Sequence, residues 1–211
     1  MNYRDYIVYD FETTSANPHT TQPVQIAAVV VHGRKLEIKP GSEFQSLMKP
    51  YLSEKKCKEY GVDMLEDGAV AVHGKTAEML KKAPSAASVW KNFTEYVKQY
   101  NFKGFDNIIV DRLCTKAPYN FGPEDKQNRP DLFNRIHSLD MLDFMFTMFE
   151  NDKEVNSLSA DNLIRGHMGY SKGQAHDAMS DVIMTAELFC RTMKMLRYTA
   201  SRKKFKNVFK D

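Results

Sequence analysis

Two carboxylates close to the N-terminus are the first candidates for chemistry in this sequence. Asp10 and Glu12 follow a β-rich run at residues 6–9. Because side chains alternate along a strand, both carboxylates point to the same face. Two like charges so close together are costly unless a cation neutralises them, and Mg²⁺ prefers a few carboxylates together with waters and phosphate oxygens. The pair predicts a divalent-metal site, although two exposed acids on a surface strand would leave the same pattern.

A third acid is expected near residue 106. Asp106 follows an asparagine-containing turn and precedes a helix expected at 107–114, a position where an aspartate is also typical as a helix N-cap. Asp111, five residues later, is its rival, and a salt bridge to the adjacent Arg112 would explain Asp111 equally well. We favour Asp106.

The pattern H-x-x-x-x-D, formed by His176 and Asp181, lies at the start of the last helix. Within a helix the two side chains would be about 140° apart. If His176 instead lies in the loop before the helix, its ring can swing over a site that Asp181 faces. This arrangement suits a mobile base beside a metal ligand, whereas a solvated histidine near a helix start is the ordinary alternative.

The elements around these residues predict an α/β protein. Extended runs at 6–9 and 24–31, and a third towards Leu47, indicate a β-meander. The later segments alternate helical and extended patterns, and we expect a mixed β-sheet with three leading antiparallel strands, flanked by helices. Helices are expected at 75–82, 86–99, 107–114, 141–149 and 158–165 and from about residue 176 onward, a strand at 135–140, and a loop at 118–130.

Composition and charge are those of one globular domain with a basic end. Of the 211 residues, 42% are hydrophobic and 27% charged, which excludes a disordered chain or a disulfide-stapled miniprotein. The net charge of +3 hides an asymmetry, because residues 191–211 hold eight bases and a single acid. We expect a domain at 1–198 and a basic C-terminal tail at 199–211, where aromatic residues between the bases suit phosphate contacts.

The cysteines and the N-terminus indicate a cytoplasmic protein. Cys57, Cys114 and Cys190 are odd in number and widely spaced, which argues for buried thiols and against a disulfide framework. No apolar stretch reaches the roughly 18 residues of a membrane helix, and the first residues lack the layout of a secretory signal. We expect no membrane partner.

Taken in order, D-x-E, the aspartate at 106 and H-x-x-x-x-D resemble the DEDDh family of 3′-to-5′ exonucleases. The resemblance extends over about residues 6–196, nearly the whole chain. It includes the segment AVHGKT at 71–76, the stretch 106–114 and SLD at 138–140. The resemblance implies a ribonuclease H-like fold.

The resemblance also implies roles for individual residues. His176 would be the general base, since an unperturbed imidazole titrates near pH 6.5. Thr13, together with the backbone after Glu12, corresponds to the part that holds the terminal sugar, and Val72 and His73 correspond to contacts with the terminal base. Phe11 is expected among the substrate-binding residues as well. The ligands of two Mg²⁺ or Mn²⁺ ions would be Asp10, Glu12, Asp106 and Asp181.

The implied reaction is release of 5′-mononucleotides from the 3′ end of a single strand, with DNA favoured as the substrate. An RNA-directed relative is the alternative within the same chemistry. A non-catalytic nucleic-acid-binding or polymerase-partner module is the alternative outside it, although such a module has no need for a cluster of like charges. A polymerase partner and a homodimer both stay open.

Overall fold

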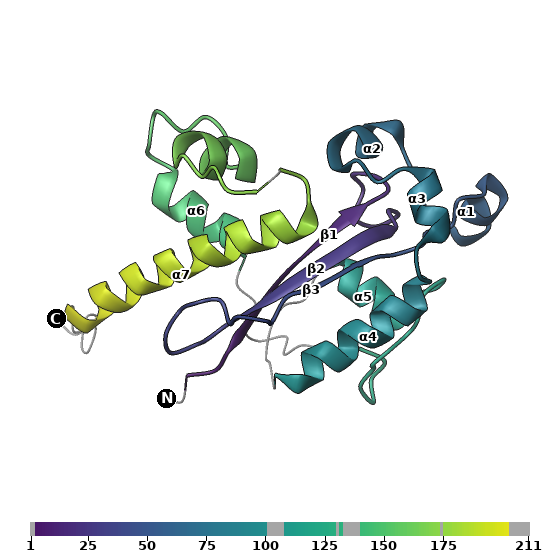
Figure 1. The fold of residues 1–211 in the computed structure, drawn as a ribbon, viewed down its shortest axis with the longest axis horizontal. Coiled ribbons are helices and arrows are strands. Elements are labelled where there is room, and N and C mark those ends of the chain that lie inside the picture. Colours follow the sequence, from purple (N-terminus) through teal and green to yellow (C-terminus); the bar gives the residue numbers. More distant parts are fainter. Residues whose placement is uncertain (1–2, 101–107, 130, 133–139, 174, 203–211) are drawn as a thin grey trace.

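The computed structural model describes residues 3–100, 108–129, 131–132, 140–173 and 175–202 (Figure 1). Its centre is a three-stranded antiparallel sheet of order β1-β2-β3, built from β1 (Tyr6–Thr13), β2 (Pro23–Val31) and β3 (Phe44–Leu47). The expected antiparallel meander is therefore confirmed. The further strand expected at 135–140 lies outside the described residues except for Asp140, which caps the following helix through a hydrogen bond from the Leu142 amide.

Helices make up most of the remaining described chain. Six of them correspond to segments with helical periodicity in the sequence, whereas α1 and α2 were not anticipated. Helix α1 consists mostly of charged residues and α2 begins with Asp67 and Gly68, so neither shows an apolar stripe at helical spacing. The helices are α1 (Glu54–Tyr60), α2 (Asp67–His73), α3 (Ala77–Lys82), α4 (Ala86–Gln99), α5 (Ile108–Thr115), α6 (Met141–Phe149), the π-helix η1 (Ala160–His167) and α7 (Ala178–Arg202).

Serine side chains and glycine fix several of these helix ends. The Ser53 and Ser85 hydroxyl oxygens accept hydrogen bonds from amides in the first turns of α1 and α4, which satisfies donors that have no partner within the helix. Gly61 ends α1 in the left-handed region at φ 62°, a conformation that glycine adopts without steric cost. Such caps place short helices that have little apolar surface of their own.

The face of the sheet towards α4 carries an aromatic core. Phe93 and Trp90 of α4 are buried against β1 and β2, and Phe93 also packs against Phe44 and Tyr96. The polar tips of two core rings have partners: Trp90 Nε1 donates to the Gly122 carbonyl at 2.6 Å, and the Tyr96 hydroxyl donates to that of Ser42 at 2.7 Å. These bonds remove the cost of burying the two polar groups.

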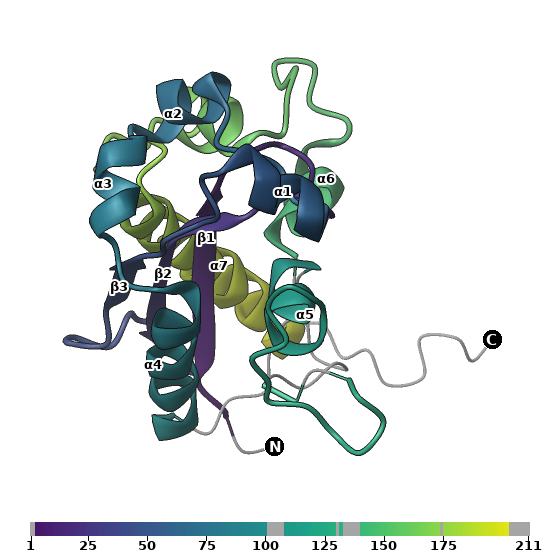
Figure 2. The ribbon, with the colours of Figure 1, turned by 90° about the vertical axis from the view of Figure 1, so that its right-hand side faces the viewer.

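The opposite face of the sheet is covered by α7 (Figures 1 and 2). Smaller side chains pack here, including Ala27 and Val29 of β2 against Ala178, Val182 and Ala186 of α7. A third cluster joins α6, η1 and α7 around Met145, Leu163 and Met184. Since α4 and α7 lie on opposite faces, successive side chains of β1 enter different environments.

Three further expectations concern the whole chain. The cysteines are buried thiols, as predicted. Helix α7 continues to Arg202, so the first residues of the expected tail at 199–211 are helical, and residues 203–211 lie outside the described part. Within the part of the chain that the structure describes, no helix combines the length and apolarity needed to cross a membrane.

Candidate active site

Strand β1 and the first turn of α7 bring three carboxylates together. One oxygen from each of Asp10, Glu12 and Asp181 lies within 4.8 Å of the others. Asp10 and Glu12 share the β1 face that packs against α7, which agrees with the alternation of side chains along a strand. All three are partly exposed, so a ligand from solvent can reach them.

Burial and mutual repulsion raise the proton affinity of this cluster. Burial raises the pKa of Asp10 to about 6, with a further contribution from the charge of Asp181, against a lowering hydrogen bond from the Phe11 amide. Burial likewise raises the pKa of Glu12 to about 7, and the charges of Asp10 and Asp181 add to it, while Lys75 opposes the shift. The negative charge of these carboxylates is thus only partly neutralised by the protein, and a bound cation would neutralise it further.

Both oxygens of Asp181 already have hydrogen-bond donors. Arg165 Nη2 lies 3.0 Å from Oδ1, and the backbone amide of His176 donates to Oδ2 at 2.9 Å. The Arg165 guanidinium also donates to the carbonyls of Lys172 at 3.1 Å and Gly173 at 3.4 Å. One arginine of η1 therefore connects the acidic cluster to the loop that leads into α7, a role that its sequence position did not indicate.

His176 lies in the turn before α7 and is exposed, so it stands outside the helix as the mobile-base arrangement requires. Its φ of 58° is left-handed, which costs a non-glycine residue about 1–2 kcal/mol. The hydrogen bond that the His176 backbone amide donates to Asp181 Oδ2 holds the residue in this conformation.

Lys75 is a second cation at the site that the sequence did not indicate. Its Nζ lies 3.4 Å from Asp177 Oδ1, and it lowers the pKa of Glu12. Asp177 also accepts from the Gln25 side chain at 3.5 Å and, through Oδ2, from the Ser180 amide at 3.4 Å. Asp177 thus caps the start of α7 and anchors Lys75 beside the acidic cluster.

His73 links the end of α2 to the end of β1. Its Nε2 lies 3.1 Å from the Thr13 carbonyl, and its Nδ1 accepts from the Lys75 amide at 2.9 Å. A carbonyl can only accept, so Nε2 carries the proton. Burial is the main cause of its lowered pKa. Both ring nitrogens of His73 are therefore engaged in hydrogen bonds with the backbone, one at Thr13 and one at Lys75.

The other residues expected to contact substrate divide into two groups. Val72 is 53% exposed beside His73, and the Thr13 hydroxyl donates to the Ser15 carbonyl at 2.9 Å. The side chain of Phe11, in contrast, is buried in the α4-side core, where it packs edge-on against Tyr9. Phe11 faces away from the carboxylates, so only its main chain adjoins the site.

Of the two rivals for the third acid, Asp106 lies outside the described residues. Asp111 is partly buried on α5 and is not part of the three-carboxylate cluster found among the described residues. The salt bridge considered for Asp111 does not explain it, because the buried Arg112 donates instead to the carbonyls of Pro18 and Thr21.

The donor set fits divalent metal. Three carboxylates converge, two of them with raised pKa values, and oxygen ligands of this kind are what Mg²⁺ and Mn²⁺ prefer. Lys75 and Arg165 together offset only part of the charge of Asp10, Glu12, Asp177 and Asp181, so a remaining negative charge is available to a cation.

Comparison with known families identifies the class of protein. Residues 7–189 match the RNase T family, described as exonuclease. The match covers most of the chain and both elements that carry the acidic cluster. The chain therefore belongs to the RNase T family of exonucleases.

Solved structures show the same fold. Cell-death related nuclease 4 aligns with a TM-score of 0.65 and 16% identity over 92% of this chain and 64% of that chain. The nuclease domain of 3′hExo, a DEDDh family member bound to rAMP, aligns with a TM-score of 0.65 and 15% identity over 91% and 92% of the two chains. Exonuclease I of E. coli in complex with an oligonucleotide aligns with a TM-score of 0.62 and 18% identity over 95% and 42%.

These likenesses confirm the ribonuclease H-like α/β fold expected from the sequence. This chain spans slightly less than two thirds of the length of the first two full proteins it matches and nearly the whole of an isolated nuclease domain. No curated protein matches the sequence.

Proposed function

We propose that this chain is a metal-dependent 3′-to-5′ exonuclease that releases 5′-mononucleotides from single-stranded nucleic acid, with DNA as the favoured substrate. The observation that carries the proposal is the convergence of Asp10, Glu12 and Asp181 to within 4.8 Å. Membership in an exonuclease family agrees with it.

Four acids would hold two Mg²⁺ or Mn²⁺ ions. They are the three clustered carboxylates and Asp106, which we favour over Asp111 as the fourth. When bound, such ions make water nucleophilic near neutral pH and stabilise the oxygen that leaves. The fourth acid would bring the number of carboxylates to that expected for a pair of ions.

His176 would act as the general base. Its place in an exposed turn lets the ring approach a water above the acidic cluster, while its main chain stays anchored to Asp181 at 2.9 Å. Proton transfer by a positioned imidazole contributes about 10²- to 10⁴-fold to a rate. Arg165 supports this step by holding the preceding loop through the Lys172 and Gly173 carbonyls.

The terminal nucleotide would lie over the end of β1. His73 fixes the Thr13 carbonyl, which orders the backbone proposed to hold the terminal sugar. The exposed Val72 offers an apolar surface for the terminal base, and such a contact discriminates little among bases. For Phe11 the proposal is restricted to its main chain.

An RNA-directed exonuclease is the second candidate. Two of the similar structures concern RNA or a ribonucleotide, one by recognition of a histone mRNA stem-loop and the other by bound rAMP. Exonuclease I in complex with a 5cy-dT13 oligonucleotide favours DNA. A binding module without catalysis would not explain why three like-charged carboxylates are held within 4.8 Å of one another.

Digestion of labelled oligonucleotides tests the proposal. Matched 5′-labelled DNA and RNA strands are incubated with Mg²⁺, with Mn²⁺ and with chelator, and Asp10→Ala serves as the inactive control. A ladder that shortens from the 3′ end only with metal supports the exonuclease, and the ratio of the DNA and RNA rates identifies the preferred sugar. Binding without cleavage by the unmodified chain would support the module instead.

A second pair of variants tests the fourth acid. We expect Asp106→Ala to abolish metal-dependent cleavage and Asp111→Ala to leave it intact. The reverse pattern would assign the role to Asp111. Because Asp111 lies on α5 beside core residues, the melting temperature of each variant is measured alongside its activity.

The basic tail at 199–211 would raise affinity for the strand without supplying chemistry. Removal of residues 203–211, which leaves α7 intact, should raise KM more at moderate salt and leave kcat nearly unchanged. A fall in kcat with normal binding would contradict this role. A polymerase partner or a second copy of the chain is compatible with the same activity.

A further inference from the structure

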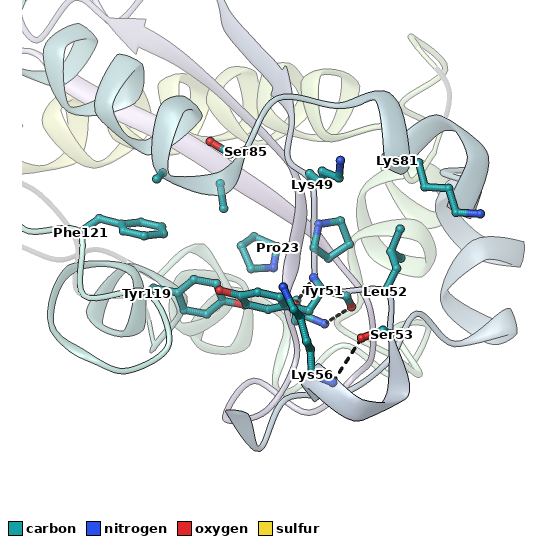
Figure 3. A pocket seen from close by; sticks show the side chains of 14 residues that line it. Pro23, Lys49, Tyr51, Leu52, Ser53, Lys56, Lys81, Ser85, Tyr119 and Phe121 are labelled. Atoms are coloured by element: carbon teal, nitrogen blue, oxygen red, sulfur yellow. Dashed lines mark hydrogen bonds between the residues drawn. The ribbon is translucent and has the colours of Figure 1, made fainter. Parts of the chain in front are cut away.

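A pocket lies at the start of α4 (Figure 3). Helix α4 covers the face of the sheet opposite to α7 and the acidic cluster. It has a volume of about 560 Å³, within the range of about 300–1,000 Å³ typical of ligand sites. Its walls come from the start of β2, the segment 49–53, α1, α3, the first turn of α4 and the loop around 119–121. None of the residues assigned to catalysis lines it.

The lining combines lysines with aromatic rings. Lys49, Lys56 and Lys81 surround it, and no acidic residue is among its described lining. All three lysines are exposed. Tyr51 and Phe121 supply ring surfaces, and Lys56 Nζ lies 5.8 Å from the centre of the Tyr51 ring. Cations that surround exposed ring faces complement phosphates and stacked bases.

A buried hydroxyl in the pocket lacks a partner. Tyr119 is 6% exposed, and its hydroxyl forms no hydrogen bond with the described residues. In Figure 3 its ring extends from the loop toward Tyr51. A buried polar group without a partner costs about 1–3 kcal/mol, and a ligand that accepts a hydrogen bond would remove that cost.

The wall that carries Tyr51 is held rigidly. The fully buried Gln22 side chain donates to the Tyr51 carbonyl at 3.0 Å and accepts from the Tyr51 amide at 2.7 Å. The same side chain donates to the Asp63 carbonyl at 2.7 Å. A preorganised wall loses less entropy when a ligand binds.

The pocket is also connected to the catalytic strand. Pro23 in its wall pairs with Thr13, one residue after Glu12, and the Gln22 main chain exchanges two hydrogen bonds of 2.9 Å with Thr14. Paired residues of adjacent strands lie about 5 Å apart. The pocket and the acids thus adjoin the same end of the sheet from opposite faces.

We propose that this pocket is a second nucleic-acid contact, which holds nucleotides of the substrate strand upstream of the 3′ end that lies at the acids. The bases stack on Tyr51 and Phe121, the lysines contact phosphates, and the Tyr119 hydroxyl donates to an acceptor of the bound strand. This inference rests on the proposed function for the direction of the strand. The binding site itself can be tested without catalysis.

The first test measures binding of fluorescent single strands in the presence of chelator, so that no cleavage occurs. The triple variant Lys49→Gln, Lys56→Gln, Lys81→Gln should bind a 20-nucleotide strand about tenfold more weakly than the unmodified chain. The slope of log K against log salt should shrink by about 2, since each phosphate contact to a single strand contributes about 0.7.

The matched control removes three charges elsewhere. Lys35, Lys98 and Lys194 are equally exposed and lie on the turn between β2 and β3, the end of α4 and the middle of α7. Their replacement by glutamine gives the same net charge as the pocket variant. Equal weakening by the two triple variants would show a general charge effect and overturn the proposal.

Tyr119→Phe tests the buried hydroxyl. Because the hydroxyl has no partner among the described residues, its removal should not lower the melting temperature, whereas it should weaken binding of the 20-nucleotide strand about threefold or more. Unchanged binding by Tyr119→Phe and by the pocket triple variant would exclude nucleic acid from this pocket. If binding falls as expected but no protein cleaves any strand, the second contact stands and the proposed exonuclease activity fails.

Discussion

The two faces of the small sheet are built for different purposes. Towards α4, buried aromatic rings such as Trp90 and Phe93 fill the core, and the Trp90 indole nitrogen and the Tyr96 hydroxyl donate hydrogen bonds to backbone carbonyls. Towards α7, the packed side chains are smaller and the β1 face ends in carboxylates whose pKa values are raised by burial and repulsion. Strand β1 thus contributes buried apolar side chains on one face and partly neutralised carboxylates on the other. A cation that binds to the carboxylate face gains the most favourable electrostatic energy there.

The largest expected effect is the loss of activity when one clustered acid is neutralised. Asp10→Asn should lower the exonuclease rate at least about 10⁴-fold, or about 5 kcal/mol of transition-state stabilisation. The metal-free variant should be as stable as the parent or more stable, because a repelling charge is gone. Kinetics and thermal melting measure the two effects.

Glu95→Gln, an exposed carboxylate on the outer side of α4, is the control for this experiment. It should change neither activity nor stability appreciably. An Asp10→Asn protein that is inactive but also unfolded would place Asp10 among the stabilising residues and erase the contrast between the faces.

The second expected effect is on stability alone. Phe93→Ala should reduce the free energy of unfolding by about 3–5 kcal/mol, because Phe93 is fully buried among several rings. On the other face, Val182→Ala should cost about 2 kcal/mol through loss of buried methyl groups. Urea unfolding gives both values, and equal costs would show that the two faces are equally important to stability.

The third effect is a pH dependence of the metal-free protein. The pKa values of Asp10 and Glu12 rise from 3.8 and 4.5 to about 6 and about 7 in the folded state. Between about pH 4 and 7 the folded protein therefore binds more protons than the unfolded one, so stability falls as pH rises. The expected loss is about 3 kcal/mol after allowance for the partial exposure of Glu12.

Melting curves in chelator from pH 4 to 8 measure this trend. The double variant Asp10→Asn, Glu12→Gln should lack the component due to the cluster, so the difference between the two curves isolates it. Added Mg²⁺ should restore more stability at pH 7.5 than at pH 5, because bound metal requires deprotonated ligands. Identical curves for the two proteins would contradict the raised pKa values.

The smallest effect concerns the contact between η1 and the cluster. Arg165→Gln removes the ion pair with Asp181 and the bonds to the loop carbonyls, and we expect a stability loss of about 1–2 kcal/mol. Misplacement of the loop that leads to His176 should lower kcat about tenfold. Arg165→Lys keeps the positive charge but lacks the several N–H donors of the guanidinium, so it should recover part of the stability but little of kcat. Full recovery of both would show that charge alone matters.

Much of the fold could be predicted from local patterns. The first two strands were indicated by runs of β-favouring apolar residues, and α4 by apolar positions that recur with helical spacing over 14 residues. Helices α1 and α2 were missed because neither has an apolar stripe at helical spacing. The fourth acid and the strand expected at 135–140 stay predictions, since they lie outside the described residues or largely so.

The candidate site was predictable only in part. Asp10 and Glu12 share a face because of strand alternation, and H-x-x-x-x-D marked the start of α7. No local pattern could indicate that Arg165 would contact Asp181 or that Lys75 would approach Glu12, since these contacts depend on where η1 and the segment after α2 lie relative to α7 and β1 in the folded chain. The side chain of Phe11 faces the core for the same reason that its two neighbours face the site.

The amino-acid sequence by itself determined which side chains share a face of a strand or helix, because that depends on backbone geometry over a few residues. It thereby specified a pair of acids, a separate H-x-x-x-x-D motif and the class of chemistry they suit. Only the tertiary structure decided which of these groups meet, which protons they hold and which cations approach them. Those properties arise from burial and from distances between segments that are far apart along the chain.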